Sequence, residues 1–265
     1  MVYNLDVRKL RKVFIALVAV AVLCLALLTV GCDKATERIY NKGYSDTVDY
    51  SVGILENGYE IEILNVDGYR LYQPKANTEW VFVFYLGTAM STDNYDAILS
   101  EVAAHGISVV VPNDKFADVM YSKTEKACGM FDCEKYILGG HSQGGGAAIR
   151  RAGENMQTTK ACVLYSPMLA PTNGTTLADS ELPVIFFEAE KDKILSSSNK
   201  SEAKSRMNGL CEYVMLEGAN HMCYGESNMI SSQDGVLERT KEAIQTQVAQ
   251  LTIEFLDNVI KAEQA

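Results

Sequence analysis

A serine with glycine two positions away on each side is the residue of this chain best placed to act as a nucleophile. It is Ser142, within residues 140–144, and it follows the apolar run 136–138 and leads into the small residues of 145–149. A serine hydroxyl attacks carbonyl carbons when it stands at a sharp strand-to-helix turn, and its neighbours two positions away must then lack bulk. The pattern therefore predicts a nucleophilic serine at such a turn.

A neutral serine needs a base to take its proton, and imidazole is the side chain suited to that role. The chain has three histidines. His105 lies at the end of a helical pattern over 95–104, and His141 is the variable residue inside the serine motif. His221 comes shortly after the strand-like run 213–216. By elimination, we predict that His221 is the base.

The base needs a carboxylate to hold it in the correct tautomer. The continuous apolar run 183–187 predicts a buried parallel strand, and three carboxylates follow its carboxyl end: Glu188, Glu190 and Asp192. We select Asp192 because a side chain placed a short loop beyond the strand can turn toward a histidine on the next loop. Glu188 is interpreted as a loop residue, and Glu190 is the alternative acid. The chain order is then serine, acid, histidine, which differs from the chymotrypsin and subtilisin orders.

The elements that must position these residues follow from the hydrophobic pattern. An antiparallel pair is expected between residues 47 and 72. Further strands are expected at 80–86, 107–111 and 161–165, and helices at 95–105, 143–155, 198–208 and 235–260. In the last helix one apolar stripe should pack on the sheet: Ile244, Val248, Leu251, Phe255 and Val259. The pattern predicts an α/β fold, and the short segment 167–182 leaves no room for a substantial lid domain.

Taken together, these motifs resemble the α/β-hydrolase superfamily, from about residue 50 to the last helix. The chain is most similar to the small, lidless branch of dienelactone hydrolases, chlorophyllases and bacterial cutinase-like polyester hydrolases. The motifs behind this resemblance are 86–89, 140–146, 190–192 and 218–221. It implies a mostly parallel central sheet flanked by helices, and an acyl-enzyme formed on Ser142 with His221 and Asp192.

By the same resemblance, the backbone amides of Thr88 and Gln143 would form the oxyanion hole. The polyester-hydrolase branch usually carries an aromatic residue where this chain has Thr88, so the resemblance implies ester hydrolysis without implying hydrolysis of polymers. The short segment 167–182 should leave the site open to solvent, which suits small or flexible esters. Met168, Met222 and Tyr224 follow strand ends and are candidates for the substrate-pocket wall, with plain packing as the alternative.

The amino end indicates where the chemistry takes place. A basic cluster at 8–12 precedes an unbroken apolar run of 18 residues, 13–30, which is followed by a small residue and Cys32. This resembles the lipobox of bacterial lipoproteins, which implies cleavage before Cys32 and lipid attachment to its sulfur. The alternative is an uncleaved transmembrane anchor, because such a run can marginally span a bilayer. Either way we expect an exported, membrane-anchored protein: residues 1–31 a signal peptide or anchor, 32–46 a tether, and 47–265 the catalytic domain.

Composition excludes several classes of partner and cofactor. Residues 1–31 carry four basic side chains and one acidic one, so the remainder has 20 basic and 33 acidic residues and a formal net charge of −13. Such a surface argues against nucleic acid as a partner. No Cys/His spacing suggests a metal site, and no phosphate-cradling or dinucleotide pattern is present. We therefore predict no metal and no cofactor, and a small-molecule ester as substrate.

Two alternatives stay open at this point. Fold does not fix function, so the chain could be an inactive, lipid-anchored binding protein built on the hydrolase fold. A peptidase or an acyltransferase uses the same nucleophile, base and acid as an esterase.

Overall fold

The computed structural model describes residues 58–75, 79–114, 123–128, 130–131, 135–169, 174–226 and 233–265. The predicted signal peptide or anchor of residues 1–31, the lipidation site Cys32 and the tether of 32–46 lie outside these ranges, as do the first residues of the predicted domain. Within the ranges, no helix combines the length and the apolar character needed to cross a bilayer.

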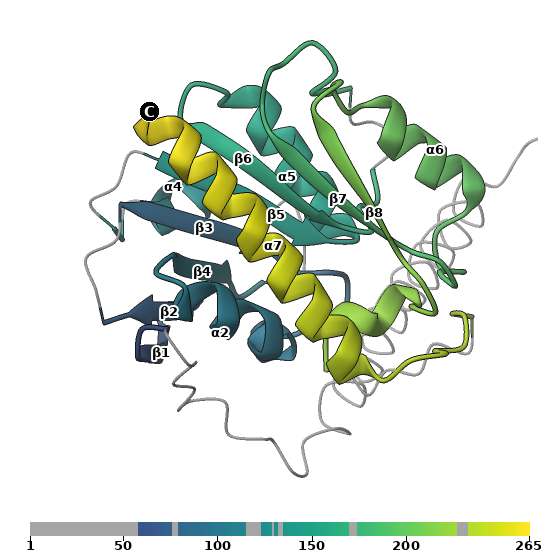
Figure 1. The fold of residues 1–265 in the computed structure, drawn as a ribbon, viewed down its shortest axis with the longest axis horizontal. Coiled ribbons are helices and arrows are strands. Elements are labelled where there is room, and N and C mark those ends of the chain that lie inside the picture. Colours follow the sequence, from purple (N-terminus) through teal and green to yellow (C-terminus); the bar gives the residue numbers. More distant parts are fainter. Residues whose placement is uncertain are drawn as a thin grey trace, which may run out of the picture. The chain divides into compact units, whose positions relative to one another are not determined.

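An eight-stranded sheet in the order β1-β2-β4-β3-β5-β6-β7-β8 forms the centre of the described structure (Figure 1). The antiparallel pairs are β1 with β2 and β2 with β4, and all other neighbouring strands are parallel. This confirms the predicted antiparallel pair near the amino end and the mostly parallel sheet. The strands are β1 (Ile61–Val66), β2 (Tyr69–Pro74), β3 (Trp80–Tyr85), β4 (Ser108–Pro112), β5 (Lys135–His141), β6 (Thr159–Tyr165), β7 (Val184–Ala189) and β8 (Cys211–Leu216).

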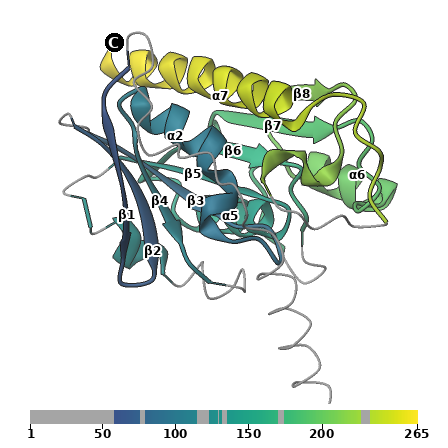
Figure 2. The same ribbon diagram turned by 90° about the horizontal axis from the view of Figure 1, so that it is seen from below.

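Helices cover both faces of this sheet. The helix α7 packs with α2 on one face, and α5 lies on the other (Figure 2). Because both faces are covered, a central strand such as β3 is buried at every residue, which explains its continuous apolar sequence. The helical elements are η2 (Thr92–Tyr95), α2 (Asp96–Ala104), α4 (Thr124–Cys128), α5 (Gln143–Glu154), α6 (Ser197–Ser205), η3 (His221–Tyr224) and α7 (Lys241–Gln264).

The last helix begins later than the sequence pattern indicates. Its expected start was residue 235, but α7 begins at Lys241, and the Thr240 hydroxyl caps it by accepting the Ala243 N–H at 3.2 Å. Gly235 is held outside the helix, since its carbonyl accepts a hydrogen bond of 2.7 Å from the Asn220 side chain. The predicted apolar stripe is otherwise correct: four of its residues are buried and Leu251 is partly buried against the core.

Glu188 also differs from its sequence-based interpretation as a loop residue. It belongs to β7, where it pairs in register with Met215 of β8, and the next pair, Ala189 with Leu216, ends the ladder. Its carboxylate forms ion pairs with Lys204 and, at 3.9 Å, with Lys200 of α6. Glu188 therefore links the carboxyl end of β7 to α6.

Parallel strands end at the same edge of a sheet, and this decides where the candidate residues meet. Ser142 directly follows β5, Asp192 lies three residues beyond β7, and His221 lies five residues beyond β8. All three follow carboxyl ends of parallel strands, which is where open α/β sheets hold their ligands.

Candidate active site

Ser142 occupies a strained turn between β5 and α5. Its backbone has φ 53° and ψ −122°, and a positive φ is rare for a residue with a side chain. Three backbone hydrogen bonds hold the turn. The Ser142 N–H donates to the Tyr165 carbonyl at 3.0 Å, and the Ser142 carbonyl accepts from Met168 at 2.8 Å and Gly146 at 3.2 Å. Backbone conformations of this kind cost about 1–3 kcal/mol and persist where the surrounding structure fixes them.

The glycines on either side of Ser142 are required by close packing of the backbone. A Cβ at Gly140 would lie 2.5 Å from the carbonyl carbon of Gly144. A Cβ at Gly144 would overlap the Tyr85 carbonyl oxygen of β3. The absence of bulk predicted from the motif is therefore a steric requirement of this turn.

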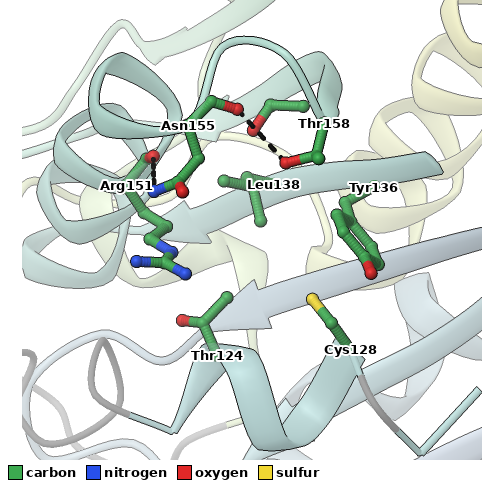
Figure 3. Close-up of a pocket in the computed structure, with 8 residues that line it drawn as sticks. Thr124, Cys128, Tyr136, Leu138, Arg151, Asn155 and Thr158 are labelled. Atoms are coloured by element: carbon green, nitrogen blue, oxygen red, sulfur yellow. Dashed lines mark hydrogen bonds between the residues drawn. The ribbon is translucent and has the colours of Figure 1, made fainter. Parts of the chain in front are cut away.

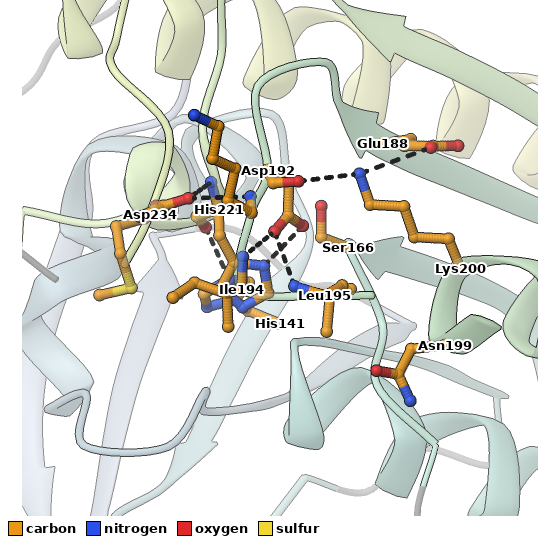
Figure 4. Close-up of polar contacts among 12 residues, drawn as sticks. His141, Ser166, Glu188, Asp192, Ile194, Leu195, Asn199, Lys200, His221 and Asp234 are labelled. Carbon is orange, nitrogen blue, oxygen red and sulfur yellow. Dashed lines mark hydrogen bonds and ion pairs between the residues drawn. The ribbon is translucent and has the colours of Figure 1, made fainter. Parts of the chain in front are cut away.

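His221 and Asp192 form a buried hydrogen-bonded pair (Figure 4). His221 Nδ1 lies 2.8 Å from Asp192 Oδ2, and the two side chains are 3% and 0% exposed. The other carboxylate oxygen, Oδ1, accepts the N–H groups of Ile194 at 2.9 Å and Leu195 at 3.0 Å. The carboxylate accepts a hydrogen bond from Nδ1–H, so the Nε2 lone pair of a neutral His221 is left to act as a base.

Burial by itself would raise the pKa of the Asp192 carboxyl. The hydrogen bond and charge of His221 lower it, as do the Leu195 amide and the charge of Lys200, and the net result is a pKa below its ordinary value. Asp192 is therefore ionised at neutral pH, as the orienting partner of an imidazole must be.

Glu190, the alternative acid, has other partners. It is exposed, accepts the Gly218 N–H at 2.8 Å and forms an ion pair of 3.2 Å with Lys191. These contacts stabilise the turn after β8, whereas the His221 ring is hydrogen-bonded to Asp192.

The described residues show no hydrogen bond between Ser142 and His221. Among the described contacts, Ser142 Oγ makes no hydrogen bond to His221, while the ring of His141, the residue before the serine, lies 4.7 Å from the His221 ring between centroids. In unliganded enzymes such bonds are often long and tighten when substrate binds.

The two amides expected to bind an oxyanion belong to exposed residues, of which Gln143 directly follows Ser142. Thr88 follows β3, and Gln143 is the first residue of α5. The first N–H groups of a helix have no acceptor within it, which leaves the Gln143 N–H available. In the described part of the chain, neither amide donates a hydrogen bond. Ala89, next to Thr88, has a positive φ of 61°, so this loop is also tightly turned.

The three candidate pocket residues lie in different environments. Met168 is half-buried, and Met222 is 9% exposed. Tyr224 has no exposed surface, bonds through its hydroxyl to Ser166 Oγ at 2.9 Å and stacks on Tyr165. Tyr224 is therefore packed in the core at the end of η3, as the packing alternative expects, and its role as a pocket residue stays a prediction.

Asp234 is a residue that sequence reasoning missed. Its carboxylate accepts the backbone N–H groups of His221 at 3.2 Å, Met222 at 3.0 Å, Gly235 at 2.8 Å and Lys193 at 3.4 Å (Figure 4). It thus caps the start of η3 and ties it to the loop that carries Asp192. No local motif marks this residue, because its partners lie up to 41 positions away.

A separate pocket of about 140 Å³ lies at the other end of β5 (Figure 3). Tyr136 and Leu138 contribute to it from the first half of β5, and Arg151 and Asn155 from the end of α5. It is therefore distant from Ser142, which follows the last residue of β5. No group of three or more His, Cys, Asp or Glu side chains in the described ranges is arranged to hold a metal ion.

Comparisons with known proteins bear on the fold and the family of this chain. A curated relative from Mycobacterium phage D29, described as a "Putative non-heme haloperoxidase", is 24% identical over 141 residues, covering 49% of this chain and 51% of that protein. The chain thus spans about half the length of that relative.

Two solved structures share the fold. A "putative lipase" from Acinetobacter baumannii AYE matches with a TM-score of 0.55 at 15% identity, covering 77% of this chain and 93% of that one. A thioesterase domain from the curacin biosynthetic pathway matches with a TM-score of 0.51 at 12% identity, covering 72% of this chain and 99% of that one. At these identities the likeness shows the fold.

The family model described as "Alpha/beta hydrolase family" matches residues 81–250, a range that contains β3 from its second residue onward, the Ser142 turn, Asp192 and His221. This agrees with the strand order and with the helices on both faces of the sheet. The chain belongs to the alpha/beta hydrolase family.

Proposed function

We propose that this protein is a serine hydrolase that cleaves carboxylic esters. Ser142 is the nucleophile, His221 the general base, and Asp192 the carboxylate that orients His221. The observation that carries the proposal is the buried 2.8 Å hydrogen bond between His221 Nδ1 and Asp192 Oδ2. It lies at the sheet edge where Ser142 is held with a positive φ.

The chemistry follows from the tautomer of His221. Because Nδ1–H donates to Asp192, Nε2 is free to accept the Ser142 Oγ proton while Oγ bonds to the ester carbonyl carbon. The carbonyl π electrons move to oxygen. When they return, the bond to the leaving alkoxide breaks and His221 gives it the proton. Water then attacks the acyl-enzyme by the same steps and releases the acid.

The negative oxygen of the tetrahedral intermediate is stabilised by the amides of Thr88 and Gln143. Backbone donors of this kind typically contribute about 3 kcal/mol each to lowering the barrier. The amino end of α5 adds positive potential beside Ser142.

Small or flexible acyl groups are the expected substrates. In the described part of residues 166–183 there is no helix or strand that would form a lid. Structural relatives described as a lipase and as a thioesterase make oxygen esters and thioesters the first substrates to test.

The test is labelling with a fluorophosphonate probe, with the modified peptide mapped, beside turnover of p-nitrophenyl esters of increasing acyl length. We expect labelling at Ser142, none in Ser142→Ala, and a preference for short chains. Labelling that persists in Ser142→Ala would refute the proposal. A folded wild-type protein that does not label would favour the inactive binding protein instead. A peptide anilide and an added alcohol acceptor, used in parallel, distinguish peptidase and acyltransferase activity.

The proposal includes export and membrane attachment. The apolar run before Cys32 supports a lipid anchor on that cysteine in a bacterial host. Metabolic labelling with an alkyne fatty acid should modify the wild type and not Cys32→Ser. A protein that stays in the membrane without any label would instead carry an uncleaved helix.

A further inference from the structure

The histidine next to the candidate nucleophile is buried and connects two loops. His141 is 1% exposed. Its Nε2 lies 3.0 Å from the backbone carbonyl oxygen of His221, and its Nδ1 lies 2.9 Å from the hydroxyl oxygen of Tyr95. That hydroxyl oxygen accepts the Gly87 N–H at 3.0 Å.

The protons in this chain of hydrogen bonds can be assigned. A carbonyl oxygen only accepts, so His141 Nε2 must carry a hydrogen to bond to His221. A neutral imidazole has a single N–H, so Nδ1 is the acceptor and the Tyr95 hydroxyl donates to it. The Gly87 N–H in turn donates to the Tyr95 oxygen.

His141 stays neutral in this environment. Burial is the main cause that lowers its pKa well below the ordinary value, and the charge of His221 lowers it further, against the hydrogen bond to the His221 carbonyl. Its other aromatic neighbours are Tyr95 and Tyr224, and burial raises the pKa of Tyr224, so that ring is also neutral. His141 therefore does not compete with His221 for the serine proton.

The partners of His141 come from two segments that follow carboxyl ends of strands, as Ser142 does. One is the His221 segment, residues 219–224, and the other is the loop after β3, where Gly87 precedes Thr88. The loop packs directly on the ring, because a Cβ at Gly87 would lie 2.6 Å from His141 Nδ1. Buried ring nitrogens need hydrogen-bond partners wherever they lie, and those of His141 have them in the His221 segment and, through Tyr95, in the loop before Thr88.

We propose that His141 is a positioning residue that fixes the His221 segment and the Thr88 loop relative to Ser142. The inference rests on the proposed hydrolase function. It gives the residue inside the serine motif a role separate from those of the nucleophile and the base.

Two substitutions separate the two hydrogen bonds of His141. Gln places an amide N–H near the position of Nε2 and keeps a donor for the His221 carbonyl, whereas Asn places an amide oxygen near Nδ1 and keeps an acceptor for Tyr95. His141→Leu removes both bonds, and Tyr95→Phe removes the link to Gly87. Asn208→Ala is the matched control. Its side chain donates a buried 2.7 Å hydrogen bond to the Leu182 carbonyl, before the start of β7 and at the opposite end of that strand from Asp192.

The readouts are kcat and KM for a short p-nitrophenyl ester, the rate of fluorophosphonate labelling, and hydrogen exchange of residues 219–224. We expect His141→Leu to lower kcat and the labelling rate by about 100-fold, the effect expected of a misplacement of about 1 Å. The kcat and labelling rate of His141→Gln should stay within about tenfold of the wild-type values and exceed those of His141→Asn. Exchange at 219–224 should be faster in His141→Leu and His141→Asn and unchanged in Asn208→Ala.

The inference is overturned if folded His141 variants match wild type in kcat and in exchange at 219–224 and lose only thermal stability, which is the result expected for Asn208→Ala. If His141→Leu does not fold, the Gln, Asn and Tyr95→Phe variants decide in the same way. Failure of the proposed function is distinguishable, since wild type itself would then neither label nor turn over ester. Hydrogen exchange would still test whether His141 holds the His221 segment.

Discussion

Gly87 and His141 are in contact so close that the Cβ of any other residue at position 87 would lie 2.6 Å from His141 Nδ1 and 3.2 Å from the Tyr95 hydroxyl oxygen. The loop after β3 and the turn that holds Ser142 are therefore fitted to each other through a buried imidazole. A substitution that displaces the loop should therefore also displace the turn.

Replacing Gly87 by alanine should lower activity by displacing the loop that carries Thr88. We expect kcat to fall by about 10²-fold with little change in KM, because the oxyanion is bound most strongly in the transition state. Gly209→Ala is the control, since a Cβ at Gly209 meets nothing within 4 Å. Equal kcat in the two variants would contradict the proposed role of the loop.

Asp192 and Glu190 should respond differently to loss of charge. Asp192→Asn removes the acceptor that holds His221 Nδ1–H, and kcat should fall by about 10³–10⁴-fold. Glu190→Gln changes an exposed carboxylate that bonds to the Gly218 amide and should keep kcat within a few-fold of wild type. Steady-state kinetics on both variants decides between the two acids, and a larger loss in Glu190→Gln would reverse the assignment.

The neutral state of His141 predicts a pH dependence of stability. Its pKa is lowered in the folded protein, so below about pH 6.5 the unfolded chain binds a proton at this site that the folded protein does not. The free energy of unfolding should therefore fall as pH falls below that value, by up to about 1.4 kcal/mol per pH unit from this residue. The free energy of unfolding, measured by urea unfolding at several pH values between 7.5 and 5, should change less steeply with pH in His141→Gln than in wild type. Identical slopes would mean that His141 is protonated in the folded protein.

Asp234 should contribute to both stability and activity through the backbone of the His221 segment. Asp234→Asn replaces one acceptor oxygen by an amide donor that faces an N–H, and we expect a loss of about 1–3 kcal/mol in the free energy of unfolding. Because η3 begins at His221, kcat should also fall, by about tenfold. Asp179→Asn, at an exposed turn, serves as the control in thermal unfolding and kinetics. Wild-type kcat in Asp234→Asn would show that the position of His221 does not depend on this cap.

Features with a local cause could be predicted from the sequence. The Ser142 turn is one, because a strand, a glycine-bounded serine and a helix follow each other within about 20 residues, and the glycines exclude bulk for steric reasons that hold in any such turn. The apolar stripe of α7 is another, since a helix that packs on a sheet must bury one face. The start of α7 was predicted too early because the contacts that hold Gly235 outside the helix come from Asn220, which is distant in the sequence.

Only the tertiary structure decided which side chains meet across the loops. Glu188, Glu190 and Asp192 lie within five residues of one another in the sequence. In the structure Glu188 forms an ion pair from β7, Glu190 bonds to an exposed turn, and Asp192 is the buried partner of His221. These different roles depend on where β7 and β8 end. The cap that Asp234 provides and the bonds of His141 arise in the same way. The physical reason is that a hydrogen bond depends on distance and direction in space, whereas the sequence pattern records only local preference and the side of an element that is buried.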